Sequence, residues 1–314
     1  MPTVLASDGT RISYSLAGRR DGEPLLMIHG LGADSRGWAR QKRAFGSRFR
    51  LVLVDNRGVG RSERPPGPYD LEVMADDALA ALDHAGYGSA HVMGASMGGI
   101  IAQVIGVRHP ERVRSLTLAC TASRHFGWRR ELLGEWADQA QAYGMREFVR
   151  RNLRWMVGPR SLRRMWPAMA VLGPLAFNVA VSSFVAQIQA ILAIDDDLRD
   201  GLTGIAVPTL VLVGSQDVLT TQGDSEEIAS LVPGAELAVI RGGAHLFMVE
   251  QAGAFNRTVL EFLDGVVADP RARPVPVVKA PATVRLASSR PAAAVVAATR
   301  SRAPRRSGSA PASG

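Results

Sequence analysis

The chain has 314 residues, 46% of them hydrophobic, and a single cysteine, Cys120. This length allows a large buried core, and one cysteine excludes both an intramolecular disulfide bond and a cysteine cluster that holds zinc or iron. The formal net charge is +8, but residues 268–314 hold nine basic residues and one acidic residue, which leaves 28 of each sign before them and argues against nucleic-acid binding by the body of the chain.

The N-terminal sequence MPTVLASDGTRISYSL does not have the basic region and continuous apolar stretch of a signal peptide. The longest apolar tract, 168–194, is interrupted by glycine, proline, asparagine, serine and glutamine. This pattern favours helices of a soluble protein over a membrane span. Together with the single cysteine, these features predict a cytoplasmic protein.

Short β-branched segments alternate with amphipathic stretches, which predicts an α/β fold with a mostly parallel central sheet and flanking helices. The predicted strands cover residues 25–28, 51–54, 90–93, 115–120, 209–213 and 237–240. Four of them are followed by loops with a distinctive sequence: HGLG at 29–32, DNRGVGRS at 55–62, GASMGG at 94–99 and GSQD at 214–217. Ligands of open α/β sheets bind beyond the carboxyl ends of the strands, so we expect these loops to meet at one site.

The third loop, GASMGG, stands between an apolar predicted strand and the helix-forming sequence IIAQVIGVRHPERV. A G-x-S-x-G sequence between strand and helix is typical of a nucleophile elbow, although it also occurs in ordinary glycine-rich connections. Gly94 and Gly98 indicate a turn too tight for a Cβ atom. The turn would place Ser96 at a helix N-terminus, where unpaired N–H groups and the helix dipole stabilise negative charge. We therefore predict that Ser96 is a nucleophile.

The regular alternation stops after the strand that ends at Cys120. Residues 123–204 contain no convincing strand and show helical amphipathicity, and so long a connection without structure of its own is unusual in a compact domain. We predict a helical cap over 123–204, inserted in an α/β core formed by 1–122 and 205–267.

Two groups of side chains in this predicted cap bear on the substrate, and each has two interpretations. The aromatic residues either line an apolar acyl pocket or form the core of the cap: Phe126, Trp128, Trp136, Trp155, Trp166, Phe177 and Phe184. The arginines either attract a carboxylate-bearing substrate or form a solvated helical face: Arg129, Arg130, Arg150, Arg151, Arg154, Arg163 and Arg164.

A serine nucleophile needs a base, and the base needs an acid that orients it. Among the six histidines, His245 follows the last predicted strand, and the order serine, acid, histidine along the chain fits the elbow-bearing fold. Asp217, at the end of the preceding strand and loop, is the predicted acid; a turn-forming aspartate is the alternative. The competing acids fall in the predicted cap or at the start of a helix: Asp195, Asp196, Asp197, Asp224 and Glu226.

Acyl transfer also needs hydrogen-bond donors for the oxyanion of the tetrahedral intermediate. In the elbow arrangement one donor is the backbone N–H after the nucleophile, which belongs to Met97. The second comes from the loop after an early strand, and HGLG assigns it to Leu31. We expect His29, just before the glycine of that loop, to shape the loop.

The last segment, 268–314, is rich in proline, alanine, serine and arginine and has no aromatic residue. Such a composition buries too little apolar surface to offset the entropy of ordering, so we predict a disordered basic tail. Either the tail is a dispensable solubilising segment, or it makes weak contacts with an anionic surface such as nucleic acid or lipid head groups.

With these four loops in this order, residues 3–267 resemble the α/β-hydrolase superfamily. LLMIHGLGADSRGW, DNRGVGRS, GASMGG and IDDDLRDGLTGIAVPTLVLVGSQD are most similar to its capped subgroup of 3-oxoadipate enol-lactonases, carboxylesterases and carbon–carbon-bond hydrolases. The resemblance implies a catalytic triad of Ser96, Asp217 and His245, oxyanion donors at Met97 and Leu31, and no cofactor.

These residues predict a serine hydrolase that cleaves a small-molecule carboxylic ester or lactone, with an apolar part, through an acyl-enzyme intermediate. Three alternatives remain open: a carbon–carbon-bond hydrolase, a cofactor-free haloperoxidase that uses the same triad, and a ligand sensor built on the hydrolase scaffold.

Overall fold

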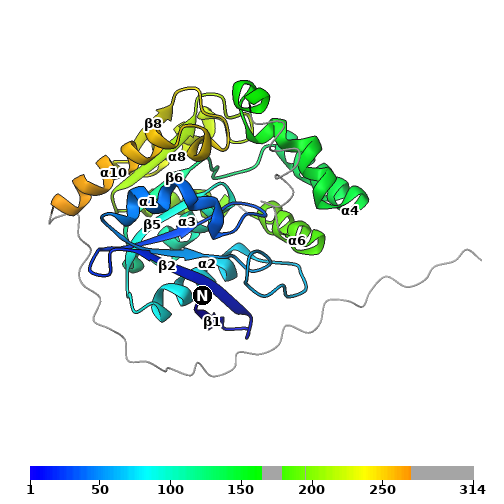
Figure 1. Cartoon of the computed structure of the whole chain (residues 1–314). Helices are drawn as coiled ribbons and strands as arrows, with labels where there is room; N and C mark the ends of the chain where they lie inside the picture. Colours follow the sequence, from blue (N-terminus) through cyan, green and yellow to red (C-terminus); the bar gives the residue numbers. More distant parts are fainter. Residues whose placement is uncertain (165–178, 195, 270–314) are drawn as a thin grey trace, which may run out of the picture. The chain divides into compact units, whose positions relative to one another are not determined.

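The structure is a computed structural model, and it describes residues 1–164, 179–194 and 196–269 (Figure 1). The chain divides into two units, Met1–Lys279 and Ala280–Gly314, and all of the described residues belong to the first. Apart from its first two residues, the segment predicted to be a disordered tail lies outside the described residues, so its disorder stays a prediction.

An eight-stranded sheet forms the centre of the described unit, with the strand order β1-β2-β4-β3-β5-β6-β7-β8. The strands are β1 (Thr3–Leu5), β2 (Arg11–Gly18), β3 (Pro24–Ile28), β4 (Arg50–Val54), β5 (Ala90–Ala95), β6 (Val113–Ala119), β7 (Thr209–Gly214) and β8 (Glu236–Ile240). β1, β2 and β4 pair antiparallel, and every other pairing is parallel. The predicted α/β fold is confirmed, and each predicted strand is present.

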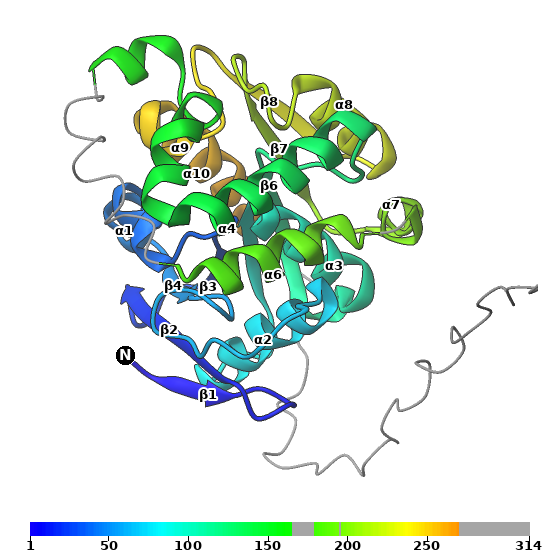
Figure 2. The same ribbon diagram turned by 90° about the vertical axis from the view of Figure 1, so that its right-hand side faces the viewer.

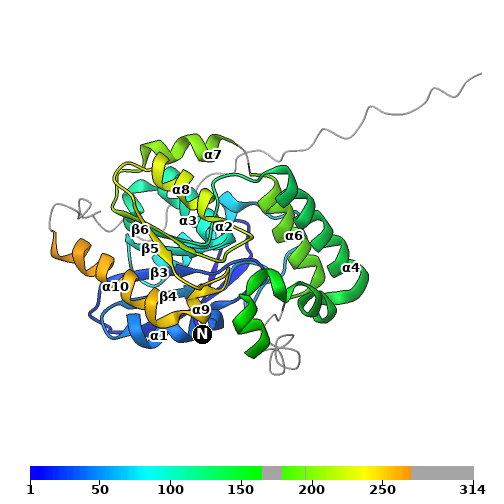
Figure 3. The ribbon, with the colours of Figure 1, turned by 90° about the horizontal axis from the view of Figure 1, so that it is seen from above.

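Helices cover both faces of this sheet, which explains why β3, β5 and β7 are buried along their whole length. One face carries α1 (Ala39–Gly46) and α10 (Ala252–Ala268) (Figure 3). The Phe45 ring of α1 contacts the Phe255 ring of α10. The other face carries α2 (Leu71–His84), α3 (Met97–Arg108) and α8 (Gln222–Leu231). The shorter helices are η1 (Ser35–Trp38), η2 (Pro110–Arg112), η3 (Leu202–Gly204) and α9 (Phe247–Glu250).

The segment between β6 and β7 contains α4 (Gly127–Met156), α6 (Val181–Leu192) and α7 (Asp196–Gly201) (Figure 2). α4 consists of two helical parts that meet at Gly144, whose φ of 73° is outside the helical region. The Phe148 ring contacts the ring of Trp136 edge to face and the ring of Phe184 at a tilt, and the second contact joins α4 to α6. These helices occupy the segment that the sequence assigns to a cap, and the domain boundaries at 122 and 205 stay a prediction.

Three strands of this sheet bring the candidate site residues to one edge. β5, β7 and β8 are parallel, so their carboxyl ends, and the residues that follow them, lie on the same side of the sheet. Among the described residues, we find no helix with the length and apolarity needed to span a membrane.

Candidate active site

Ser96 lies in the turn between the last residue of β5, Ala95, and the first residue of α3, Met97. Its φ of 55° falls in the left-handed region, which is uncommon for residues other than glycine. A Cβ atom at Gly94 would overlap the backbone of Gly98, and one at Gly98 would overlap the carbonyl oxygen of Ile28. The prediction that these glycines permit a tight turn is therefore confirmed.

The structure brings the three predicted triad side chains together. His245 Nε2 lies 3.0 Å from Ser96 Oγ, and His245 Nδ1 lies 2.9 Å from Asp217 Oδ2. Both His245 and Asp217 are buried. This is the geometry in which an aspartate fixes the Nδ1–H form of the imidazole and leaves Nε2 free to accept the serine proton.

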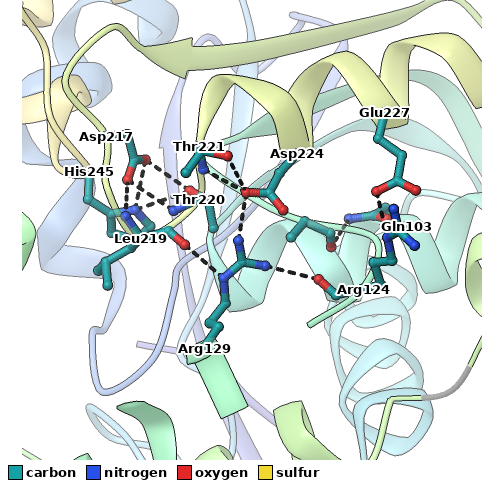
Figure 4. A network of polar contacts seen from close by, with 11 residues as sticks. Gln103, Arg124, Arg129, Asp217, Leu219, Thr220, Thr221, Asp224, Glu227 and His245 are labelled. Atoms are coloured by element: carbon teal, nitrogen blue, oxygen red, sulfur yellow. Dashed lines mark hydrogen bonds and ion pairs between the residues drawn. The ribbon is translucent and has the colours of Figure 1, made fainter. Parts of the chain in front are cut away.

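The loop after β7 holds Asp217 in its ionised form (Figure 4). Leu219 and Thr220 donate their backbone N–H groups to Asp217 Oδ1, and the Thr220 hydroxyl donates to Oδ2 at 2.9 Å. Burial by itself raises the pKa of this carboxyl, but His245 and the hydrogen bonds from Thr220 hold the pKa below its ordinary value. At neutral pH the carboxylate can therefore stabilise a positive charge on His245.

The competing acids lie elsewhere. Asp196 and Asp197 are in the first turn of α7. Asp224 forms a capping box with Thr221 at the start of α8, as its position near a helix N-terminus predicts. Glu226 lies one turn into the same helix and accepts a hydrogen bond from Gln222. Asp195 lies outside the described residues.

The HGLG loop lies directly against the serine turn. A Cβ atom on Gly30 would stand 3.0 Å from Ser96 Cβ, so the backbone that carries Leu31 comes close to the serine side chain. Met97 is the first residue of α3, where the N–H has no intrahelical acceptor. Leu31 and Met97 both line the cavity that contains Ser96, which is where the predicted oxyanion donors belong.

His29 supports this loop from within. Its Nδ1 accepts the N–H of Gly30 at 2.8 Å, and its ring packs against Trp38. Burial lowers the pKa of His29 to about 4, so the ring is neutral at physiological pH. These contacts agree with the expectation that His29 shapes the loop.

A cavity of about 270 Å³ opens beside Ser96 and His245. Residues from the loops after β3, β5, β6, β7 and β8 line it together with residues of α4 and α6. Most of the lining side chains are apolar, including Leu132, Leu133, Trp136, Ile191, Leu219, Met248 and Val249. Among the described residues, no cluster of histidine, cysteine, aspartate or glutamate is arranged to hold a metal ion.

The aromatic residues of the predicted cap divide between the two interpretations. Trp136 lines the cavity and also packs against Phe148, whereas Phe184 is buried in the core. Phe126 and Trp128 are each 43% exposed and so are neither core nor enclosed lining. Outside the described residues lie Trp166 and Phe177.

The interpretation of the arginines as a solvated face is wrong for one of them. The side chain of Arg129 is 5% exposed and forms an ion pair with the buried Asp224 at 2.6 Å. The other arginines of that set in the described chain are exposed: Arg130, Arg150, Arg151, Arg154, Arg163 and Arg164.

Two residues of the site were not found from the sequence. Thr220 contacts both Asp217 and His245, and its position three residues after an aspartate in a turn is a signal that could have found it. Glu250 accepts the N–H groups of Gly158 and Ala244, each at 2.9 Å, and so joins the end of the α4 region to the residue before His245. No local pattern marks that contact, because Gly158 is 92 residues away in the sequence.

Comparison with known proteins places the chain in a family. A model of the α/β hydrolase fold matches residues 23–252. The chain belongs to the α/β hydrolase fold family. The family and the names of the relatives together support hydrolase activity, and the family agrees with the resemblance inferred from the four loop sequences.

Several α/β hydrolases are similar to this chain over most of their length. A protein from Azorhizobium caulinodans named "putative carbamate hydrolase RutD" is 33% identical over 77% of this chain and 91% of its own. The 3-oxoadipate enol-lactonase 2 of Acinetobacter baylyi is 29% identical over 82% of this chain and 94% of its own. The crystal structure of an enol-lactonase from Burkholderia xenovorans LB400 superposes with a TM-score of 0.78, at 29% identity, over 84% of this chain and all of that one.

Proposed function

We propose that this α/β hydrolase is a serine hydrolase that cleaves a carboxylic ester or lactone through an acyl-enzyme intermediate. The observation that carries the proposal is the hydrogen-bonded series Ser96, His245 and Asp217, with contacts of 3.0 and 2.9 Å, at the wall of an apolar cavity. The names of similar proteins, an enol-lactonase and a carbamate hydrolase, support a carbonyl bonded to a heteroatom as the target.

In the first half of the reaction, Ser96 Oγ attacks the substrate carbonyl while His245 Nε2 takes the hydroxyl proton. The carbonyl oxygen becomes an oxyanion that accepts hydrogen bonds from the N–H groups of Met97 and Leu31. Asp217 stabilises the imidazolium. Collapse of the tetrahedral intermediate then breaks the bond to the alcohol oxygen, which leaves with the proton from His245.

In the second half, a water molecule attacks the acyl-enzyme carbonyl and gives its proton to His245. The second tetrahedral intermediate collapses, the carboxylic acid is released, and Ser96 recovers its proton. For a lactone the alcohol and the acid belong to one molecule, so the product is a hydroxy acid or its tautomer.

The test combines covalent labelling with ester hydrolysis. A fluorophosphonate probe is expected to modify Ser96, as located by peptide mass mapping, and Ser96→Ala is expected to lose both labelling and hydrolysis of p-nitrophenyl butyrate. The matched control is Ser115→Ala, because Ser115 also hydrogen-bonds a histidine, His91. Labelling of another serine, or hydrolysis that persists in Ser96→Ala, would overturn the proposal.

A further inference from the structure

Arg129, on α4, is the one arginine or lysine found among the described residues that line the cavity beside Ser96. Each of its guanidinium nitrogens donates to the protein itself (Figure 4). Nε donates to the carbonyl oxygen of Leu219 at 2.8 Å, Nη1 to that of Arg124 at 3.0 Å, and Nη2 to Asp224 Oδ2 at 2.6 Å. The charged end of the side chain is therefore directed into the protein.

The charge of Arg129 is cancelled by a carboxylate of equal burial. The side chains of Arg129 and Asp224 are 5% and 1% exposed. Asp224 Oδ2 also accepts the N–H and the hydroxyl of Thr221, at 2.7 and 2.9 Å, which keeps this oxygen in place beside the guanidinium. A buried pair at this distance presents almost no net charge to the cavity.

Two other basic side chains at the cavity wall, His125 and His29, do not supply a positive charge either. Burial, with Arg129 and Arg130 nearby, lowers the pKa of His125 to about 3, so this ring is neutral at pH 7. His29 is neutral as well. Glu250 is acidic, and both of its oxygens accept backbone N–H groups. A carboxylate in the acyl group would lose its hydration and would gain no unpaired cation from Arg129, His125 or His29 in return.

We propose that Asp224 is a specificity-determining residue, because its pairing with Arg129 makes the cavity select esters or lactones with an uncharged acyl group and reject those that carry a carboxylate. The inference rests on the proposed ester or lactone hydrolysis and narrows its substrate class. Of the two interpretations of the cap arginines, it excludes attraction of a carboxylate by Arg129 in the wild-type enzyme.

Replacement of Asp224 by asparagine removes the charge with little change of shape. Oδ2 carries the contacts to Arg129 and Thr221, and an amide oxygen can take its place. Among the described residues, Oδ1 has no hydrogen-bond partner, so the amide nitrogen can occupy that position without displacing one. In Asp224→Asn the positive charge of Arg129 is left unbalanced beside the cavity.

The test compares two esters of nearly equal size. The neutral one is p-nitrophenyl 5-oxohexanoate, and the charged one is the mono-p-nitrophenyl ester of glutaric acid, which has an anionic oxygen in place of the terminal methyl group. A second pair, the 6-oxoheptanoate and the adipate, covers a longer chain. The wild-type enzyme is expected to favour the neutral ester in kcat/KM by at least about tenfold, and Asp224→Asn to reduce that ratio by at least about tenfold. Because each ratio is measured on one enzyme, a shift of the Asp217 loop affects both esters alike and cancels.

The matched control is Asp196→Asn, which removes an exposed negative charge from α7 and is expected to leave the ratio unchanged. If Asp224→Asn does not fold, the double variant Arg129→Met with Asp224→Leu replaces the pair by apolar side chains, an exchange that buried ion pairs often tolerate. It is expected to keep the preference for the neutral ester, since the cavity stays uncharged.

Equal or better hydrolysis of the carboxylate esters by the wild-type enzyme would overturn the inference. The inference would also be overturned if Asp224→Asn had the same ratio of kcat/KM values as the wild-type enzyme, or if the double variant preferred the carboxylate esters. Absence of hydrolysis of every ester, together with absence of labelling at Ser96, would instead overturn the proposed function itself.

Discussion

Two serine–histidine–carboxylate series occur at opposite ends of the parallel strands of the sheet. At the carboxyl ends, Ser96, His245 and Asp217 are joined by contacts of 3.0 and 2.9 Å. At the amino ends, His91 Nδ1 lies 2.8 Å from Ser115 Oγ, and His91 Nε2 lies 3.0 Å from Glu23 Oε2. The residue types and distances are nearly the same, although the serine contacts Nε2 in the first series and Nδ1 in the second.

The surroundings of the two serines differ. Ser115 lies within β6, directly opposite His91 on β5, and its side chain is fully buried. It does not line the cavity that contains Ser96. Ser96 stands outside any strand, at a helix N-terminus and beside the HGLG loop. The comparison teaches that hydrogen-bond distances alone do not define a hydrolytic site, which also needs access for the substrate and donors for an oxyanion.

The largest difference between the two series is expected in kcat, when the carboxylate of each series is replaced by an amide. Asp217→Asn permits the wrong tautomer of His245 and should lower kcat by about 10⁴-fold. Glu23→Gln should leave kcat within about threefold, because its histidine does not reach the cavity. Steady-state hydrolysis of p-nitrophenyl butyrate measures both values. A loss in Glu23→Gln that matches the loss in Asp217→Asn would break the distinction between the two series.

For protein stability the order should be reversed: replacing the serine of the amino-end series should cost more than replacing the serine of the carboxyl-end series. Ser115→Ala leaves His91 Nδ1 buried without its partner, so the free energy of unfolding should fall by about 1–3 kcal/mol. Ser96→Ala should change that free energy by less than about 0.5 kcal/mol, because the lost hydroxyl faces a cavity. Urea unfolding followed by circular dichroism compares the two variants with the wild type. Equal destabilisation by both would contradict the structural role assigned to the amino-end series.

The pH dependence of stability offers a finer distinction. The hydrogen bond with His91 and the guanidinium of Arg114 lower the pKa of Glu23 from 4.5 to about 2. A lowered pKa stabilises the folded state above the unfolded value, near 4.5, and this contribution is lost as the pH falls through the folded value, near 2.

The thermal midpoint of the wild type should therefore fall between pH 4.5 and pH 2, and Glu23→Gln should show a shallower decline over the same interval. Differential scanning calorimetry at half-unit steps measures both. Parallel curves below pH 4.5 would show that Glu23 is not stabilised in its ionised form.

The smallest effect is expected from removal of the C-terminal segment. Every residue of both series precedes it. Deletion of 270–314 should therefore change kcat/KM on p-nitrophenyl butyrate by less than about twofold, and the midpoint of urea unfolding by less than about 0.5 M. The deletion should abolish low-salt retention on heparin, because residues 270–314 hold nine basic residues and no acidic one, and the rest of the chain has 28 basic and 29 acidic residues. Lost activity would mean that the segment packs on the hydrolase unit.

The sequence predicted the carboxyl-end series because each member follows a strand. Ser96 is marked by glycines that the backbone requires, and Asp217 and His245 come after apolar runs whose parallel pairing places them together. Their catalytic roles stay a prediction. The amino-end series was not predicted, because Glu23 and His91 meet only through the register of strands that are far apart in the sequence.

Residue pairs that form only through tertiary packing could not be predicted from the sequence either. Arg129 and Asp224 are 95 residues apart, and an arginine in an amphipathic helix next to other arginines favours a solvated position. Only the packing of α4 against the loop before α8 buries both. For the same reason the composition of the cap did not decide between core and pocket for Trp136, which serves both.

The capping box at the start of α8 limits how this protein can diverge. Asp224 holds the first turn of that helix as well as the guanidinium, so a mutation there changes local folding and charge at once. An asparagine could still accept the N–H of Thr221 but could not balance the charge of Arg129. Arg129 does not take part in the capping box of α8. We therefore expect related chains that acquire a new substrate range to vary first at position 129 and to keep the aspartate.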